Sequence, residues 1–244
     1  MKKILLFIRN FILSLLVIVL IFASALLYTG YQRYLDEIDN YPVEVALTNI
    51  EADKDFVSYD DISKDLTNAL VAIEDHRFFL RDGIDIIAIA RAFITNLNNK
   101  TIAEGGSTIT QQLAKNIYFN HNVSLTRKVA EIFFVYDIES KFSKQKILSY
   151  YANIIYYGDG YYGIKKASEG YFHKDCSELT LFEASLLAGL PQSPSNYQLS
   201  SSLDLALKRQ QQVLKAMYTY DFISEKEYND CLNMQQTFNM EDYQ

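Results

Sequence analysis

Two glutamates are the side chains whose type and surroundings could move a proton in a reaction. Glu74 follows the apolar run of residues 70–73, where partial burial would raise the pKa of its carboxyl group and improve it as a proton acceptor near neutral pH. Glu131 lies three and four residues after Lys128 and Arg127, on the same face of a predicted helix, which favours an ionised carboxylate among cations. Most glutamates are solvated surface residues, so both remain candidates, and the sequence alone does not bring them together.

A second candidate site is the segment Gly-Gly-Ser-Thr-Ile-Thr-Gln-Gln-Leu-Ala-Lys-Asn at residues 105–116. If a helix starts at Ser107, its free backbone N–H groups and the positive end of its dipole form a binding site for an anion such as phosphate. Polar side chains on that helix fall four residues apart in two pairs, Gln111 with Lys115 and Gln112 with Asn116. The alternative is a glycine-rich turn before an ordinary capped helix, and a nucleotide P-loop is excluded because the Lys-Ser/Thr ending is absent.

Helices are the elements that would position these groups. From residue 61 to 79 apolar side chains recur at spacings of three and four, which predicts an amphipathic helix with Glu74 and Asp75 at its end. Serine or threonine marks the start of further helices, at Ser107 or Thr108, Ser124, Ser143, Thr180 with Glu183, and Ser224 with Glu227. Residues 84–97 are apolar almost all round and are expected to be buried or to contact lipid. Because strand alternation is nowhere sustained, we predict a compact, mainly α domain over about residues 43–228.

The N-terminal segment carries a membrane signal. Residues 11–28 contain no charge, and Lys2, Lys3 and Arg9 precede them, so the positive-inside rule places the N-terminus in the cytoplasm and the following chain outside. We predict a cytoplasmic N-terminus at residues 1–10, a transmembrane anchor at 11–30, a linker at 31–50, the main domain at 51–230 and a C-terminal tail at 231–244. A cleavable signal peptide is the alternative, since residues 23–25 read Ala-Ser-Ala, but the apolar run continues past that point and favours an uncleaved anchor.

Composition restricts the class of protein. At 244 residues, with 49% apolar and 22% charged residues, the chain has room for one medium folded domain and a short accessory segment. A net charge of −7 argues against a general nucleic-acid binder, and any polyanionic ligand must be met by locally placed lysines and arginines. Cys176 and Cys231 fit no metal spacing and either pair or stay free. No metal is assigned to the three dispersed histidines, His76, His121 and His173.

Five segments in this order resemble the motifs of the peptidoglycan glycosyltransferase family, in particular of its monofunctional, membrane-anchored members, over about residues 56–227. Glu74-Asp75 with residues 78–83 resembles E-D-x-x-F-x-x-H-x-G, and residues 105–116 match G-G-S-T-I-T-Q-Q-L-x-K-N at every defined position. Arg127-Lys128 with Glu131 fits R-K-x-x-E. Residues 147–164 and 183–192 resemble the fourth and fifth motifs. Five ordered motifs make a specific match.

The resemblance implies a lysozyme-like, α-helical fold with a small membrane-associated jaw that includes residues 84–97. It implies lipid II and the lipid-linked glycan chain as substrates and the membrane as the place of work, with other cell-wall synthesis proteins as partners and no role for nucleic acid. The implied reaction joins the 4-hydroxyl of one lipid II sugar to the anomeric carbon of the growing chain, inverts that carbon and releases undecaprenyl pyrophosphate, which builds β-1,4 glycan strands. No organic cofactor is expected.

The resemblance also assigns roles to residues. Glu74 carries over as the catalytic base, and Glu131 as a second carboxylate that assists the leaving group directly or through a divalent ion, Mg²⁺ or Mn²⁺. The residues expected to hold the pyrophosphate and the sugar are Asp75, Phe78, Gly106, Ser107, Thr108, Gln111, Gln112, Lys115, Asn116, Arg127 and Lys128. Preorganised cations near developing negative charge can supply roughly 2 to 4 kcal/mol per well-placed donor.

Two residues depart from the family pattern. Arg81 stands where the family usually has histidine, and Val123 where many members have a further arginine; Arg81 could replace some of the lost positive charge. The capping-box spacing of Glu183 favours a structural role. Residues 143–146 have the Ser-x-x-Lys form of a penicillin-binding transpeptidase, but no Lys-Thr-Gly follows, so we expect a monofunctional enzyme.

Two other functions remain open at this point. A lytic or hydrolytic glycan-cleaving enzyme would also use a key glutamate in such a fold, but it needs a protonated acid at the leaving oxygen and no pyrophosphate site, so the intact segment 105–112 argues against it. The other is a catalytically impaired, membrane-tethered scaffold of the cell-wall machinery, which the departures at Arg81 and Val123 favour.

Overall fold

The computed structural model describes residues 2–85, 87, 106–119 and 124–240. Helices form every element in these ranges, and the only β pairing there is a single antiparallel bridge between Tyr156 and Tyr162. The predicted mainly α class is therefore confirmed for this part of the chain. His121, Val123 and most of the predicted jaw at residues 84–97 lie outside the described residues.

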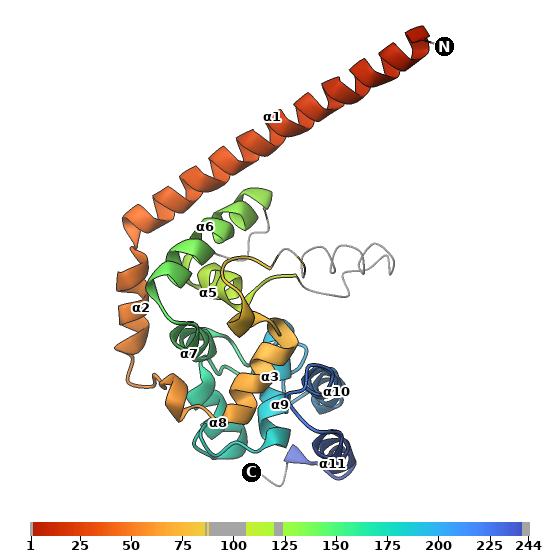
Figure 1. Cartoon of the computed structure of the whole chain (residues 1–244). Coiled ribbons are helices and arrows are strands. Elements are labelled where there is room, and N and C mark those ends of the chain that lie inside the picture. The colour runs from red at the N-terminus through yellow and green to blue at the C-terminus, as the bar shows by residue number, and fades with distance from the viewer. Residues whose placement is uncertain (1, 86, 88–105, 120–123, 241–244) are drawn as a thin grey trace.

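The N-terminal helix α1, Lys2–Asn40, extends away from the rest of the molecule as a single rod (Figure 1). Among the described residues it is the one helix long and apolar enough to cross a membrane, a test that a signal sequence would also pass. Pro42 then precedes helix α2, Val43–Glu51. The predicted linker at residues 31–50 is thus almost entirely helical, because Tyr34 and Ile38 on the last turns of α1 pack against the domain core.

Three helices form the centre of the domain, α3 (Lys64–Glu74), α9 (Leu181–Gly189) and α10 (Leu203–Thr219). Helix α9 is apolar on all sides and almost wholly buried, as expected for a helix surrounded by others. The remaining helices are α5 (Ile109–Tyr118), α6 (Leu125–Lys141), α7 (Lys144–Ile154), α8 (Ile164–Phe172) and α11 (Glu225–Gln235). Short 3₁₀ turns lie at Tyr59–Asp61, Phe78–Leu80 and Leu190–Gln192.

Helix α3 is shorter than the helix predicted at residues 61–79. Ser63 caps it, its side chain accepting a hydrogen bond from the backbone N–H of Leu66, and the chain leaves helical geometry at Asp75. Glu74 and Asp75 therefore lie at the helix end, as predicted. The other predicted starts are confirmed by side-chain caps at Thr108, Ser124, Ser143, Thr180 with Glu183, and Ser224 with Glu227.

Three further side chains that the sequence analysis singled out are buried in the domain. Glu183 caps α9 together with Thr180 and lies 2.7 Å from Lys174 Nζ, so its predicted structural role is confirmed. Cys176 and Cys231 are both buried and free rather than paired.

Candidate active site

A cavity of about 430 Å³ lies beside the C-terminal end of α3. Its polar lining includes Glu74, Ser107, Gln112, Lys115 and Arg209. Elsewhere in its wall the rings of His76 and Tyr220 stack with their centroids 3.8 Å apart. Segments that are distant in sequence, from the first and second motifs and from α10, thus share one cavity.

Glu74 is the last residue of α3 and is half-buried at this cavity. Its Oε2 accepts a hydrogen bond from Gln112 Nε2 at 2.5 Å, and Gln112 Oε1 accepts one from the buried Tyr151 hydroxyl at 3.2 Å. Burial raises the pKa of the Glu74 carboxyl, the direction predicted from the sequence, whereas the Gln112 hydrogen bond and the charges of Arg209 and Lys115 oppose the rise. A carboxyl group tuned in this way is suited to accept a proton near neutral pH.

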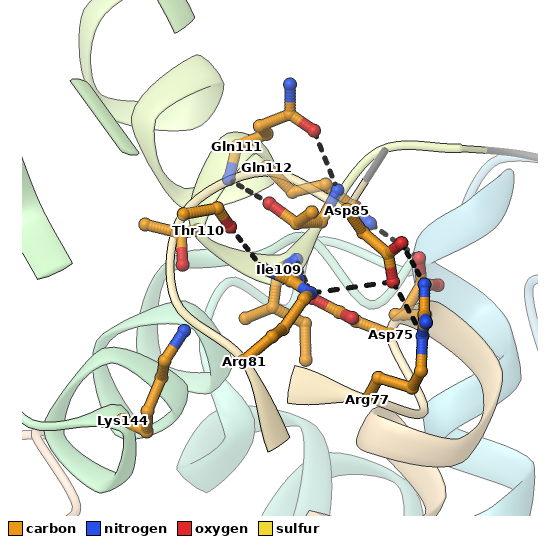
Figure 2. Close-up of polar contacts among 12 residues, drawn as sticks. Asp75, Arg77, Arg81, Asp85, Ile109, Thr110, Gln111, Gln112 and Lys144 are labelled. Atoms are coloured by element: carbon orange, nitrogen blue, oxygen red, sulfur yellow. Dashed lines mark hydrogen bonds and ion pairs between the residues drawn. The ribbon is translucent and has the colours of Figure 1, made fainter. Parts of the chain in front are cut away.

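Asp75, the next residue, is buried and holds two segments together (Figure 2). Its Oδ2 forms an ion pair with Arg81 and accepts a hydrogen bond at 3.3 Å from the backbone N–H of Ile109, the first residue of α5. Asp85 adds a second carboxylate, 3.5 Å from Arg81 Nε, and also pairs with Arg77. The carboxylates of Asp75 and Asp85 therefore neutralise the positive charge of Arg81, which among the described residues forms no ion pair with Glu74.

The start of α5 differs from the predicted anion site. The helix begins at Ile109, and Thr108 and Gln111 form a capping box in which each side chain accepts a hydrogen bond from the backbone N–H of the other residue. Because the Ile109 N–H is bonded to Asp75, the positive end of the α5 dipole is met by the protein's own carboxylate. The backbone N–H groups of Thr108, Ile109 and Gln111 are thus engaged within the chain. A substrate contact of the buried Thr108 and Gln111 stays a prediction, whereas their capping role is observed.

The carboxylate of Glu139 connects the start of α5 to the segment that contains Gly83. Glu139 of α6 accepts hydrogen bonds from Thr110 Oγ1 at 2.5 Å and from the Gly83 N–H at 2.6 Å, and Lys144 Nζ lies 2.8 Å from its Oε2. Lys144 also lies 4.6 Å from the ring centroid of Phe78. The sequence assigns Phe78 a contact with substrate, but the structure buries it completely in the core, so it can only support the site from behind.

The second predicted glutamate lies in a cluster of cations on α6. Glu131 is 0% exposed, 3.1 Å from Arg127 Nε and 2.7 Å from Lys128 Nζ. Lys128 Nζ also donates a hydrogen bond to Ser107 Oγ at 2.8 Å. The three α6 residues therefore share one helix face, as predicted, and Lys128 connects them to a residue that lines the cavity.

Lys115 is electrostatically coupled to both glutamates. It lines the cavity with Glu74, and its ammonium group interacts electrostatically with both Glu74 and Glu131. Burial lowers the pKa of Lys115, the two carboxylates raise it, and the nearby charges of Lys128 and Arg127 lower it further. The structure thus brings together the two carboxylates and the predicted phosphate-binding cations.

Arg209 of α10 is a charged lining residue that the sequence did not indicate. It is buried, its charge lowers the pKa of Glu74, and it donates hydrogen bonds to Gln212 Oε1 at 2.7 Å and to the Gly189 carbonyl at 3.4 Å. A Cβ at Gly189 would lie 2.9 Å from Arg209 Cγ, so glycine permits this approach of α9 and α10. Arg209 reaches the site only through helix packing, and no local motif marks it.

Two further predicted binding residues are absent from the cavity lining. Asn116 is exposed on α5, and Gly106 is half-buried in the segment before Ser107. Their contact with substrate stays a prediction.

A divalent ion at Glu131 also stays a prediction, and the surroundings of this carboxylate do not favour it. Its oxygens face Arg127 and Lys128, and the described part of the chain holds no cluster of three histidine, cysteine or acidic side chains. Mg²⁺ and Mn²⁺ require several oxygen ligands, and neighbouring cations repel a further cation. The residues present therefore do not fit such an ion.

Replacing Gln112 by leucine should move the acidic limb of the pH–rate profile to higher pH. The Gln112 hydrogen bond lowers the raised pKa of Glu74, so its loss raises that pKa further. A base acts in its ionised form, so activity is lost as the pH falls through the pKa. With a higher pKa, a smaller fraction of Glu74 is ionised at neutral pH in the variant than in the wild type. We expect about a tenfold lower rate at neutral pH and recovery at alkaline pH. Tyr151→Phe, which keeps Gln112, should shift the limb less; an unchanged limb in Gln112→Leu would contradict this coupling.

Replacing Glu131 by glutamine should destabilise the fold. The substitution leaves Arg127 and Lys128 without the buried carboxylate that pairs with them, and breaking a buried ion pair typically costs about 3–5 kcal/mol. We expect the melting temperature of the full-length protein in detergent to fall by about 10 °C. The exposed Glu178, given the same substitution, serves as the control. Equal melting temperatures for the two variants would show that the Glu131 ion pairs do not stabilise the domain.

Comparison with known proteins gives similarities in both sequence and structure. A family model described as Transglycosylase matches residues 43–218. Penicillin-binding protein 1A of Aquifex aeolicus is 43% identical over 178 residues, which cover 73% of this chain and 24% of that protein. A Cupriavidus necator protein, provisionally named a transglycosylase, is 38% identical over 226 residues, which cover 93% of this chain and 94% of that protein. The crystal structure of penicillin-binding protein 1A from Haemophilus influenzae covers 72% of this chain and 17% of that chain, with 25% identity and a TM-score of 0.43. The chain thus spans about a quarter of the length of the Aquifex relative.

Proposed function

Because this chain belongs to the transglycosylase family, we propose that it is a peptidoglycan glycosyltransferase that polymerises lipid II into β-1,4 glycan strands and releases undecaprenyl pyrophosphate. The observation that carries the proposal is that Glu74, Lys115 and Ser107 line one cavity, and that Lys128, which pairs with Glu131, donates a hydrogen bond to Ser107. Glu74 is suited to accept a proton, and the nearby cations are suited to receive a diphosphate. Both can therefore act on one bound pair of substrates.

In the proposed reaction Glu74 accepts the proton of the 4-hydroxyl as the oxygen of that group attacks the anomeric carbon of the donor. The bond from that carbon to the diphosphate oxygen breaks, and its electron pair leaves with the diphosphate. Lys115 and Lys128 neutralise the negative charge that develops there, and Glu131 holds Lys128 in position. The hydrogen bond from Gln112 orients the Glu74 carboxylate.

The proposal includes a membrane anchor and an extracytoplasmic active site. The apolar helix α1 supports the anchor, and the basic residues before it support a cytoplasmic N-terminus. A lipid-linked substrate would then be met at the outer membrane surface. Monofunctional action stays a prediction, supported by a similarity that extends over 94% of the Cupriavidus necator protein.

The site geometry favours this function over the two alternatives. A glycan-cleaving enzyme needs a protonated acid and no diphosphate site, whereas Lys115, Arg127 and Lys128 gather beside Glu131. A scaffold that has lost activity is the other alternative, and Arg81 favours it in the sequence. Arg81 pairs with Asp75 and leaves the hydrogen bond between Gln112 and Glu74 intact, which weakens that argument.

Incubation of the full-length protein in detergent with purified lipid II tests the proposed function. We expect long glycan chains to form and finished glycan strands to remain intact. Degradation of finished strands would indicate a lytic enzyme. If the protein neither polymerised lipid II nor degraded finished strands, a scaffold would be indicated. Either of these two results would contradict the proposal.

A further inference from the structure

The end of the anchor helix packs tightly against α6, the helix that carries the cation cluster. Gly30 is buried at this contact, and a Cβ there would lie 2.4 Å from Val129 Cγ1. Tyr31 and Tyr34 continue the contact on the next turn, with ring centroids 5.0 Å from Phe133 and 4.8 Å from Phe134, respectively. Helices α1 and α6 therefore behave as one packed unit at this level.

This packing places Arg33 at the first turn of α6. Arg33 Nη1 donates a hydrogen bond to Ser124 Oγ at 3.4 Å, and its guanidinium carbon lies 5.0 Å from the ring centroid of Phe119. Ser124 is the N-cap of α6, and its Oγ also accepts a hydrogen bond from the Arg127 backbone N–H at 3.1 Å. The guanidinium group thus lies within about one helical turn, ~5 Å along the axis, of the backbone of Lys128.

The electrostatics of this turn favour the binding of an anion. Arg127 and Lys128 lie near the start of α6, the first turn contains no acidic residue, and a helix start carries partial positive charge. Arg33 adds a third cation from another helix. The single negative charge of Glu131 pairs with two positive charges, those of Arg127 and Lys128. Lys115 also interacts with Glu131 and adds a further positive charge. An anionic group would relieve this excess of positive charge.

We propose that Arg33 is a diphosphate-binding residue, a cation that the anchor helix supplies to the leaving-group site on α6. The inference rests on the proposed function and deepens it, because it makes α1 part of the active site and not only a tether. Arg33 adds no bond-making step. Residue 33 follows the apolar run of residues 11–28 by about one to two helical turns, so its guanidinium lies where the diphosphate of a membrane-embedded lipid would emerge.

Binding of inorganic pyrophosphate to the full-length protein in detergent, followed by calorimetry, tests this assignment. We expect Arg33→Gln to weaken binding about 5- to 10-fold, because one charge-assisted contact is lost. Arg33→Lys keeps the charge, and lysine also binds phosphate as a point charge, so this variant should stay within about 2-fold of the wild type. Lys215→Gln removes a charge from an exposed site on α10 and should have no effect. Wild-type affinity in Arg33→Gln, or an equal loss in Lys215→Gln, would overturn the assignment.

Folding is monitored separately by helix content and melting temperature. If Arg33→Gln loosened α1 from α6, Arg33→Lys would still report on the charge, because it keeps a cation on the same helix face. A loss of affinity in Arg33→Lys as large as that in Arg33→Gln would mean that packing, and not charge, is at work, and would also overturn the assignment.

Polymerisation in vesicles separates the lipid-linked diphosphate from the phosphate headgroups of ordinary membrane lipids. Arg33→Gln should lower the rate of lipid II polymerisation, and by the same factor in neutral phosphatidylcholine vesicles and in vesicles that also contain phosphatidylglycerol. A defect confined to the anionic vesicles would show that Arg33 binds lipid headgroups, against the proposal. A wild-type protein that binds pyrophosphate through Arg33 but never polymerises lipid II would instead contradict the proposed function alone.

Discussion

Replacing Glu74 by glutamine should lower the rate of lipid II polymerisation by about 10³- to 10⁴-fold, because a glutamine amide cannot accept the proton of the attacking hydroxyl. The fold should survive the change. Burial disfavours the charged form of this carboxyl group, so a neutral amide of nearly the same shape is expected to melt at the wild-type temperature or above it. The initial rate of glycan formation and the melting temperature, measured on one preparation, test both statements.

Glu178 offers a matched control for this substitution, because it is an exposed glutamate outside the cavity lining. Glu178→Gln should polymerise lipid II at the wild-type rate. Turnover close to normal in Glu74→Gln would exclude Glu74 as the base. Equal losses in the two variants would point to an unspecific effect of the change in charge.

Replacing Lys115 by methionine should lower kcat/KM for lipid II by about 10²- to 10³-fold, the usual loss when one preorganised donor to a developing negative charge is removed. Lys115 is half-buried and its charge interacts with both Glu74 and Glu131, so it acts where solvent screens it little. The same substitution removes a charge that lowers the pKa of Glu74, and the acidic limb of the pH–rate profile should therefore move to higher pH. Steady-state rates over a range of pH values measure both effects.

The two effects of Lys115→Met can be told apart. At a pH above the acidic limb, where Glu74 is ionised in either protein and Lys115 of the wild type still carries its charge, the shift in the pKa of Glu74 no longer matters and the loss of diphosphate binding remains. Lys215→Met, at an exposed position of α10, is the control and should leave both quantities unchanged. A full return of activity at that pH in Lys115→Met would show that this lysine acts only on the base and does not receive the leaving group.

Local features of the fold could be predicted because they depend on residues close in sequence. Ser124 and Ser143 cap their helices by accepting hydrogen bonds from N–H groups three residues ahead. The threonine and glutamine at positions 108 and 111 also have capping-box spacing, so the correct start of α5 could have been read from the sequence. The bond from the Ile109 N–H to Asp75 could not, because it joins segments that only the fold brings together.

The parts of the site that escaped prediction depend on helix packing. Arg209 reaches the cavity because α10 packs against α3 and because Gly189 leaves room for its side chain. Helix α1 continues into the predicted linker, as far as Asn40, because its tyrosines pack on α6. The same packing brings Arg33 to Ser124, the N-cap of α6, although 91 residues separate the two in sequence.

The central claim is that the departing diphosphate rests on the cations beside Glu131 while the attacking sugar faces Glu74. An experimental structure of the full-length protein with a lipid-linked diphosphate sugar tests it most directly. We expect phosphate oxygens within hydrogen-bonding distance of Lys115 and Lys128, and the sugar in the cavity beside the Glu74 carboxylate. A diphosphate bound elsewhere, for example at the separate cavity lined by Lys165 and Lys166, would contradict the account.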